Sequence, residues 1–348
     1  METTLSYALT YIDRITGHHD KHKLTSARLI ILADNDYYSH PNSSTAATEA
    51  PGGSRFAKFP VPLSGANKTG LGSSAALVTS LTASLLVHYL PADKFDLTSP
   101  YGQRTLHNLA QAAHCAAQGK VGSGFDVAAA VYGSCLYRRF SPSTLSSIPE
   151  PGTGGFSETL AKIVDSEWDV DVRSDGLAVP AGVTLRMCDV DCGSQTVGMV
   201  KKVLAWRGQD VEVSKKLWDD LQHHNEDLAQ ALSSGDTKSL PVKIEAIRGL
   251  IREMSKLSDV PIEPPSQTEL LDAVSGVDGV FGGVVPGAGG FDAAALLMKN
   301  DGETVKRVEE FLASWSKEKN GSRVKLLEVK GEMEGVRREN LDVYKGWV

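Results

Sequence analysis

A glycine-rich turn at residues 68–76 is the part of this sequence that points most directly to chemistry. It reads Lys-Thr-Gly-Leu-Gly-Ser-Ser-Ala-Ala and runs straight into a long segment with a helical pattern. Free N–H groups and the positive dipole end at a helix start attract anions, and glycines let phosphate oxygens approach the backbone. The turn therefore predicts a phosphate site, to which Ser73 and Ser74 would add hydroxyl groups for phosphate or Mg²⁺. The alternative is a serine that caps a core helix.

Two other glycine-loop motifs fit this turn less well. Gly65 and Gly70 have the spacing of a P-loop, but the Lys and Ser or Thr that must follow are replaced by Leu71 and Gly72. Residues 70–75 match the GxGxxA pattern of a dinucleotide fold, yet the preceding residues 59–69 are proline-rich and cannot form the buried strand which that fold requires. A Walker NTPase and a dinucleotide-binding fold are both disfavoured.

A second constellation places a carboxylate at the start of another helical segment. In residues 119–128, Gly-Lys-Val-Gly-Ser-Gly-Phe-Asp-Val-Ala, three glycines precede Asp126. A carboxylate at such a point could orient an attacking group or accept its proton during phosphoryl transfer. The alternative is that Asp126 caps the helix.

A third glycine-rich segment spans residues 282–292, where five glycines bracket a bend before the apolar run 293–298. Crowding of the backbone against a ligand would explain them. Alone this signal is weak, because glycine-rich turns between strands are common.

The other residues with chemical potential have plainer interpretations. The cysteines have neither CxxC pairs nor zinc-ligand spacing and are interpreted as free thiols; they are Cys115, Cys135, Cys188 and Cys192. Five histidines in polar surroundings are interpreted as solvated; they are His18, His19, His22, His223 and His224. Asp189 and Asp191 could meet a cation, but a strand end near a turn is favoured because no third carboxylate accompanies them.

These segments need a mixture of helices and strands to position them. Leu77, Leu81 and Leu85 recur at i,i+4 spacing and predict a helix over 73–90, and the Ala-rich run 103–119 predicts another that ends at Gly119. Serine- and proline-rich stretches at 41–56 and 141–160 predict exposed loops. The region beyond residue 180 predicts strands at 184–191, 282–285, 293–299 and 323–329, and helices at 197–208, 211–233, 241–257, 266–275 and 302–316. This mixture favours an α+β fold without internal repeats.

Composition agrees with a globular enzyme. The chain has 348 residues, of which 41% are hydrophobic and 23% charged, with a net charge of -7 and no dense run of Lys or Arg. Nucleic acid and anionic membranes are therefore not expected as partners. No run reaches the ~18 apolar residues of a membrane span, and residues 1–20 contain no apolar signal region, so a cytoplasmic location is expected.

Together the three glycine-rich segments resemble the GHMP kinase family, in which the sequence of Gly70–Ala76 forms the nucleotide-phosphate loop. Residues 34–39, 119–134, 262–272 and 285–297 resemble the phosphomevalonate kinases of fungi within that family. The resemblance implies a two-domain α+β fold. Its first part, residues 1–180, would be an incomplete nucleotide-binding domain like S5 domain 2, and its second part, residues 181–348, would be ferredoxin-like. The implied reaction is ATP-dependent phosphorylation of 5-phosphomevalonate, a small-molecule substrate, with Mg²⁺.

The resemblance also assigns roles to residues. Asp126 would be the catalytic carboxylate, and Ser74 would contact the metal. The nucleotide phosphates would lie against Lys68, Gly70, Leu71, Gly72, Ser73, Ser74 and Ala75. The acceptor would lie against Ser123, Gly124, Ser194, Thr196, Gly287, Ala288, Gly289 and Gly290. Residues 191–196 open a helix that carries Lys201 and Lys202, which favours an acceptor phosphate there, although a capped surface helix is the alternative.

Two departures from the family pattern lead to further expectations. The family's first motif, with its substrate-binding Lys, has no counterpart in this sequence, so about a hundred or more residues of the first domain are expected to be absent. Where some relatives hold Mg²⁺ with a Glu, this chain offers His114, Cys115 and Gln118. The alternatives to an active kinase are a truncated nucleotide-binding remnant without turnover, or a sister kinase acting on mevalonate or a sugar.

Overall fold

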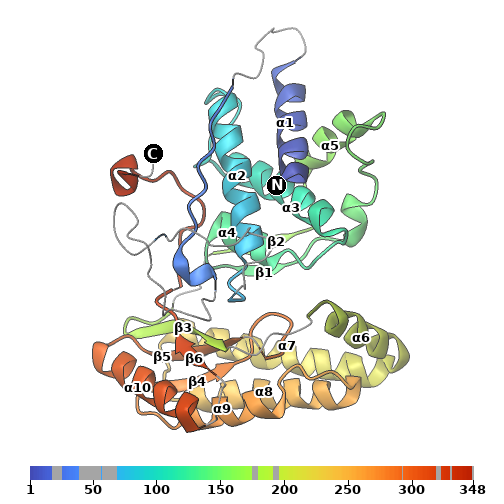
Figure 1. Ribbon diagram of the computed structural model, residues 1–348. Coiled ribbons are helices and arrows are strands. Elements are labelled where there is room, and N and C mark those ends of the chain that lie inside the picture. The colour runs from blue at the N-terminus through green and yellow to red at the C-terminus, as the bar shows by residue number, and fades with distance from the viewer. Residues whose placement is uncertain are drawn as a thin grey trace. The chain divides into compact units, whose positions relative to one another are not determined.

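The computed structural model describes residues 1–17, 26–38, 56, 69–174, 179–190, 196–291, 293–318, 323–329 and 331–346, without the side chains of residues 196 and 197 (Figure 1). The described residues group into two compact units. Unit one comprises the described parts of 1–32, 72–175 and 332–348, and unit two comprises those of 33–71 and 176–331. The two units are interleaved along the chain. The domain division near residue 180 stays a prediction.

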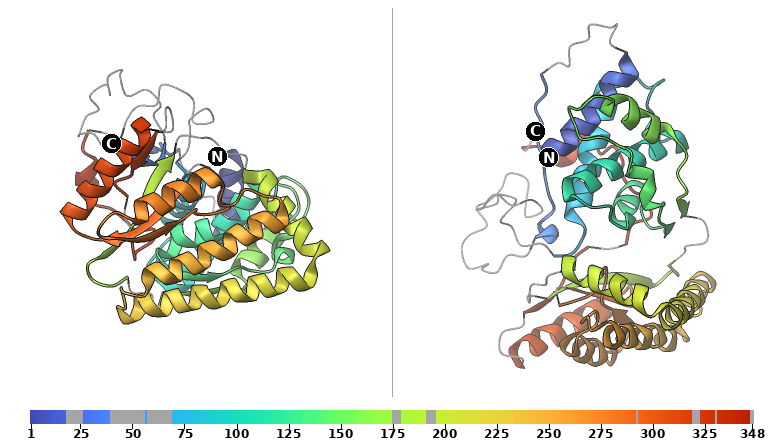
Figure 2. Two further views of the ribbon diagram at one scale, coloured as in Figure 1. Left: turned by 90° about the horizontal axis from the view of Figure 1, so that it is seen from below. Right: turned by 90° about the vertical axis from the view of Figure 1, so that its right-hand side faces the viewer.

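Unit one is mainly helical, and its helices surround one apolar core (Figure 2). The helices are α1 (Glu2–Thr16), α2 (Ser73–Tyr89), α3 (Pro100–Gln118), α4 (Phe125–Tyr132) and α5 (Phe156–Asp165), and the strands β1 (Leu136–Arg138) and β2 (Asp171–Arg173) pair antiparallel. The centre is α3, which packs against α1, α2, α4 and α5. Ser99 caps its start by accepting a hydrogen bond from Gly102 N at 3.0 Å, and Gly119 ends it at φ 63°.

Unit two contains a four-stranded antiparallel sheet in the order β4-β5-β3-β6. Its strands are β3 (Val183–Val190), β4 (Val280–Val284), β5 (Ala293–Lys299) and β6 (Val324–Leu326). Its helices are α6 (Thr196–Gln209), α7 (Val211–Ser234), α8 (Leu240–Ser258), α9 (Pro265–Ser275) and α10 (Gly302–Glu318). Leu296 and Met298 of β5 pack with residues of α9 and α10, whereas Leu297 packs with Leu240 and Ile244 of α8. Successive side chains of a strand point to opposite faces, so the two helix groups contact different faces of β5.

Short 3-10 helices complete the structure at Asn35–Tyr37, Pro142–Leu145 and Leu341–Tyr344. The predicted helices over 73–90 and 103–119 and the nine elements predicted beyond residue 180 are confirmed, with small shifts at their ends. The prediction of an exposed loop over 141–160 is wrong for its last part. Residues from Phe156 begin α5, and Phe156 and Leu160 are buried. Their packing in the apolar core outweighs the local serine and glycine content. Residues 41–55 lie outside the described part of the chain.

Candidate functional site

The glycine turn leads into α2 as an uncapped helix start. Gly72 is the N-cap residue, with φ 71° in the left-handed region, and no described side chain caps the helix. The first intrahelical bond runs from Ala76 N to Gly72 O at 3.1 Å, which leaves the earlier N–H groups of Ser73, Ser74 and Ala75 at the helix end. The predicted helix N-terminus is confirmed. The alternative of a serine at the N-cap is wrong, because Gly72 occupies that position.

The residues before this helix are fixed within unit two. Thr69 is buried, and its hydroxyl donates to Asp36 O at 2.6 Å. A Cβ placed on Gly70, which has φ 78°, would lie 3.7 Å from the Cβ of Ala293, the first residue of β5. The turn therefore reaches the strand that follows the third glycine-rich segment.

Asp126 lies beside the turn within unit one. It is the second residue of α4, whose N-cap residue Gly124 has φ 85° and no side chain to cap the helix. A Cβ placed on Gly72 would lie 3.7 Å from the Cβ of Asp126, and the Asp126 side chain is 26% exposed. Asp126 is not the N-cap residue of α4, but its carboxylate accepts from Val127 N at 2.9 Å and so satisfies one free N–H group of the first turn, which bears out part of the helix-cap alternative. Tertiary structure thus brings two motifs about fifty residues apart into contact.

His114 connects the two motifs. Its Nε2 lies 3.2 Å from Ser74 Oγ and 2.9 Å from Gln118 Nε2, and its Nδ1 lies 3.9 Å from Asp126 Oδ2. The Gln118 amide is a donor, so Nε2 is assigned as the acceptor, and the imidazole proton then lies on Nδ1, which faces Asp126. From the sequence, His114 was expected only near the position where some relatives hold Mg²⁺ with a Glu, and these contacts were not predicted. The i,i+4 spacing of His114 and Gln118 on one helix was the available signal.

The loop before Asp126 rests on polar side chains. Tyr137 Oη donates to Ser123 O at 3.0 Å, and Arg139 Nη2 donates to Gly122 O at 2.9 Å. The loop is closely packed at Gly124, since a Cβ there would lie 2.6 Å from Tyr137 Oη and 2.7 Å from Gln111 Oε1, and these side-chain ends would have to shift.

Burial sets the protonation of the side chains beneath this loop. Burial raises the pKa of the Tyr137 phenol, so the hydroxyl group remains a hydrogen-bond donor at neutral pH. Burial also raises the pKa of the Cys115 thiol, which accepts from Gln111 Nε2 at 3.1 Å. The described cysteines, Cys115, Cys135 and Cys188, are free thiols as predicted, and Cys192 lies outside the described residues.

The third glycine-rich segment forms a tight turn in unit two. Gly287, Gly289 and Gly290 all have positive φ, at 65°, 80° and 106°. Gly289 N donates to Pro286 O at 3.1 Å, and Gly290 N donates to Ile262 O at 2.8 Å. A meeting of this turn with Asp126 stays a prediction, as do the acceptor roles of Gly287, Ala288, Gly289 and Gly290.

Several predicted site residues cannot be placed. Lys68 and Ser194 lie outside the described residues, as do His18, His19, His22 and Asp191, and the side chain of Thr196 is outside them too. Thr196 begins α6, on which Lys201 and Lys202 are exposed. His223 is exposed, as expected. Among the described residues, no group of three His, Cys, Asp or Glu side chains could hold a metal ion.

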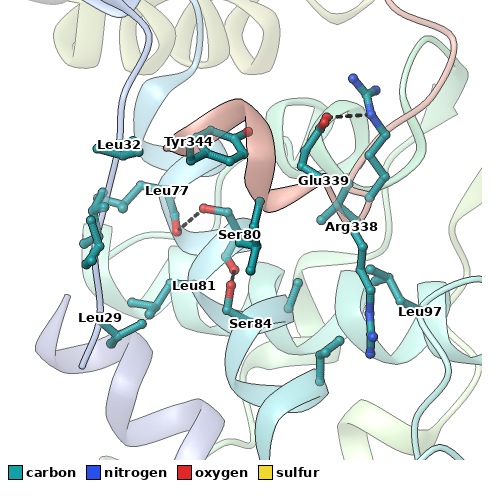
Figure 3. A pocket seen from close by; sticks show the side chains of 17 residues that line it. Leu29, Leu32, Leu77, Ser80, Leu81, Ser84, Leu97, Arg338, Glu339 and Tyr344 are labelled. Atoms are coloured by element: carbon teal, nitrogen blue, oxygen red, sulfur yellow. Dashed lines mark hydrogen bonds and ion pairs between the residues drawn. The ribbon is translucent and has the colours of Figure 1, made fainter. Parts of the chain in front are cut away.

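A cavity of about 530 Å³ in unit one is separate from these motifs (Figure 3). It lies between residues 29–32, one face of α2 and residues 336–344, and its lining includes Leu77, Leu81 and Arg338. Ser80 and Ser84, which face it, donate to carbonyl groups of α2. None of the predicted site residues lines it, so it is not the candidate site.

Comparisons with known proteins agree with the fold and the motifs. Residues 58–134 match the model of the GHMP kinases N terminal domain, which includes both the turn and Asp126. A solved structure of L. major mevalonate kinase in complex with R-mevalonate has a TM-score of 0.51 at 15% identity, and the match covers 76% of this chain and 67% of that one. The fold and motifs together define a small-molecule kinase of the GHMP class.

Curated relatives define the family more narrowly. Phosphomevalonate kinase ERG8 of Gibberella zeae is 70% identical over 350 residues, which cover 100% of this chain and 78% of that protein. Phosphomevalonate kinase erg8 of Aspergillus fumigatus is 47% identical over 372 residues, covering 100% of this chain and 75% of that protein. The chain belongs to the phosphomevalonate kinase family. In the described part of the chain, every helix is too short or too polar to cross a membrane.

Proposed function

We propose that this protein transfers the γ-phosphoryl group of ATP to the phosphate group of 5-phosphomevalonate, giving 5-diphosphomevalonate and ADP. The observation that carries this proposal is the close approach of Asp126 to an uncapped helix start, since a Cβ placed on Gly72 would lie 3.7 Å from the Cβ of Asp126. A helix start binds phosphate, and a carboxylate beside it can act on the group that attacks that phosphate. The family membership supports the choice of substrate.

The phosphate groups of ATP would lie against the N–H groups of Ser73, Ser74 and Ala75. The glycines at 70 and 72 have positive φ and lack side chains that would block the approach. Lys68 would add a positive charge. These donors stabilise the charge that spreads over the transferred phosphoryl oxygens.

Asp126 would orient the acceptor rather than remove a proton from it. A phosphate acceptor is already an anion at neutral pH, so one of its oxygens can attack the γ-phosphorus while the bond to the β-phosphate oxygen breaks. Ser123, Gly124, Ser194, Thr196 and residues 287–290 would surround the acceptor. His114 would hold Ser74 and Asp126 at a fixed separation through the contacts described above.

Mg²⁺ fits the donors present, because it prefers oxygen ligands and is commonly held by one or two carboxylates with substrate phosphates and water. The Ser74 hydroxyl and the Asp126 carboxylate would hold it. The ion would neutralise phosphate charge. A cytoplasmic location is also part of this proposal.

The test is a coupled assay of ADP release with purified protein, ATP and 5-phosphomevalonate. Asp126→Asn should lower kcat by at least about 100-fold, because the carboxylate is lost and the side-chain size is kept. Asp93→Asn, at an exposed position away from α4, is the matched control and should leave kcat unchanged. A kcat of Asp126→Asn within about threefold of wild type would rule out the assigned role.

A further inference from the structure

The glycine turn at 287–290 is held by contacts with one short segment, residues 262–267. Gly290 N donates to the carbonyl oxygen of Ile262 at 2.8 Å. A Cβ on Gly289 would overlap that same oxygen and the Cγ2 of Ile262. The turn therefore lies in direct contact with the backbone at Ile262, and its glycine at 289 is required by that contact.

A second anchor holds the far end of the turn. Gln267, on the first turn of α9, donates from Nε2 to the carbonyl oxygen of Phe291 at 2.6 Å. Its side chain is buried, with Gln267 only 2% exposed. The bond is part-buried, and breaking it would leave the amide donor of the buried Gln267 without its acceptor. Ile262 and Gln267 thus hold the turn on both sides.

Ion pairs and a hydrogen bond around one buried carboxylate, that of Glu263, fix the segment that carries these two anchors. Glu263 is 4% exposed, and its carboxylate accepts from Arg248 Nη2 at 2.8 Å, from Arg252 Nη1 at 3.1 Å and from Thr268 Oγ1 at 3.0 Å. Arg248 also pairs with Asp272 Oδ1 at 2.7 Å. These bonds join α8 and α9 to the residue directly after Ile262.

Such a cluster adds little net stability to a fold for the solvation free energy that it costs. Burying charges costs solvation free energy, and apolar residues of similar volume often stabilise a protein as well or better. What a charge cluster provides is one defined geometry, since each carboxylate oxygen has fixed partners. This cluster lies one residue from the carbonyl group of Ile262, which accepts a hydrogen bond from the glycine turn. Its defined geometry can therefore position the turn.

We infer that Glu263 and Gln267 are positioning residues that set the conformation of the 287–290 turn for catalysis. The catalytic part of this inference rests on the proposed function, in which the turn faces the acceptor. Phosphoryl transfer depends on placement, and a displacement of about 1 Å can cost about 100-fold in rate. Neither side chain needs to touch the substrate.

The test variant is Gln267→Met, which keeps the volume of the side chain and removes the donor to Phe291 O. Hydrogen exchange followed by mass spectrometry should show exchange of peptides covering 287–291 about five- to tenfold faster, with peptides of α10 unchanged. In the assay of ADP release, kcat/KM should fall by about tenfold, with little change in melting temperature. Glu263→Gln should accelerate exchange at the same peptides.

Two control variants separate positioning from a general loss of stability. Gln222→Met changes an exposed glutamine of α7 and should alter neither readout. Leu312→Val removes a methylene from the core of α10 and should lower the melting temperature without accelerating exchange at 287–291.

The outcomes are distinct. Unchanged exchange at 287–291 in Gln267→Met overturns the anchoring, and accelerated exchange with unchanged kcat/KM overturns its catalytic role. Should the wild-type protein not phosphorylate 5-phosphomevalonate, the proposed function fails, and the exchange measurement still decides whether these residues hold the turn.

Discussion

Substitution of Gly124 tests how tightly the loop before Asp126 is packed. Gly124→Ala places a methyl group at φ 85°, which costs about 1–2 kcal/mol for a residue with a Cβ. The methyl group would also lie 2.6 Å from Tyr137 Oη and 2.7 Å from Gln111 Oε1, and overpacking of this kind costs about 1–3 kcal/mol. The total is about 2–5 kcal/mol, or about 5–15 °C in melting temperature.

The matched control is Gly119→Ala. Gly119 also has positive φ, at 63°, but a Cβ there would meet nothing within 4 Å. This variant should therefore lose only the backbone component, about 1–2 kcal/mol. Thermal unfolding followed by circular dichroism compares the two variants directly. Equal losses for Gly124→Ala and Gly119→Ala would refute the packing argument.

A second substitution separates the two parts of the cost. Tyr137→Phe removes the hydroxyl group that the new methyl group meets, so the double variant Gly124→Ala/Tyr137→Phe should be more stable than the sum of the single effects by about 1 kcal/mol. The double variant also loses the bond from Tyr137 Oη to Ser123 O. Because Gly124→Ala also disturbs the packing of Tyr137 and Gln111, loss of activity in this variant alone does not demonstrate that Gly124 contacts the substrate.

Three further predictions concern protonation, the third glycine turn and the imidazole beside Asp126. Burial lowers the pKa of His107 from 6.5 to about 4, so below about pH 6.5 the unfolded chain binds a proton that the folded chain does not, and the free energy of unfolding falls as the pH drops. Between pH 7.5 and 5 this free energy should fall by about 2 kcal/mol. Urea unfolding of His107→Gln should show a smaller fall over the same pH range. Gly289→Ala should destabilise more than Gly287→Ala in thermal unfolding, since both have positive φ but only the first overlaps a neighbouring carbonyl group, and equal losses would contradict this. His114→Ala should lower kcat by about tenfold with little change in the KM for ATP, whereas an unchanged kcat would remove His114 from the site.

Much of the secondary structure could be predicted because it depends on neighbours in the sequence. The helix over 73–89 follows from apolar residues at i,i+4 spacing, and Gly119 ends α3 because glycine adopts the left-handed conformation without strain. The turn at 70–72 was recognisable for the same reason. The misassigned residues from 156 show the limit, since Phe156 and Leu160 form a helix through contacts with a distant core.

The sequence by itself determined the helix start after Gly72, the position of Asp126 at the start of a second helical segment, and the family to which these motifs belong. The tertiary structure decided which of these residues meet. It placed Gly72 beside Asp126, His114 between Ser74 and Asp126, and the carbonyl group of Ile262 within hydrogen-bond distance of Gly290 N. The physical reason is that helix caps and glycine turns are local properties of the backbone, whereas contacts between distant residues depend on how whole helices pack together.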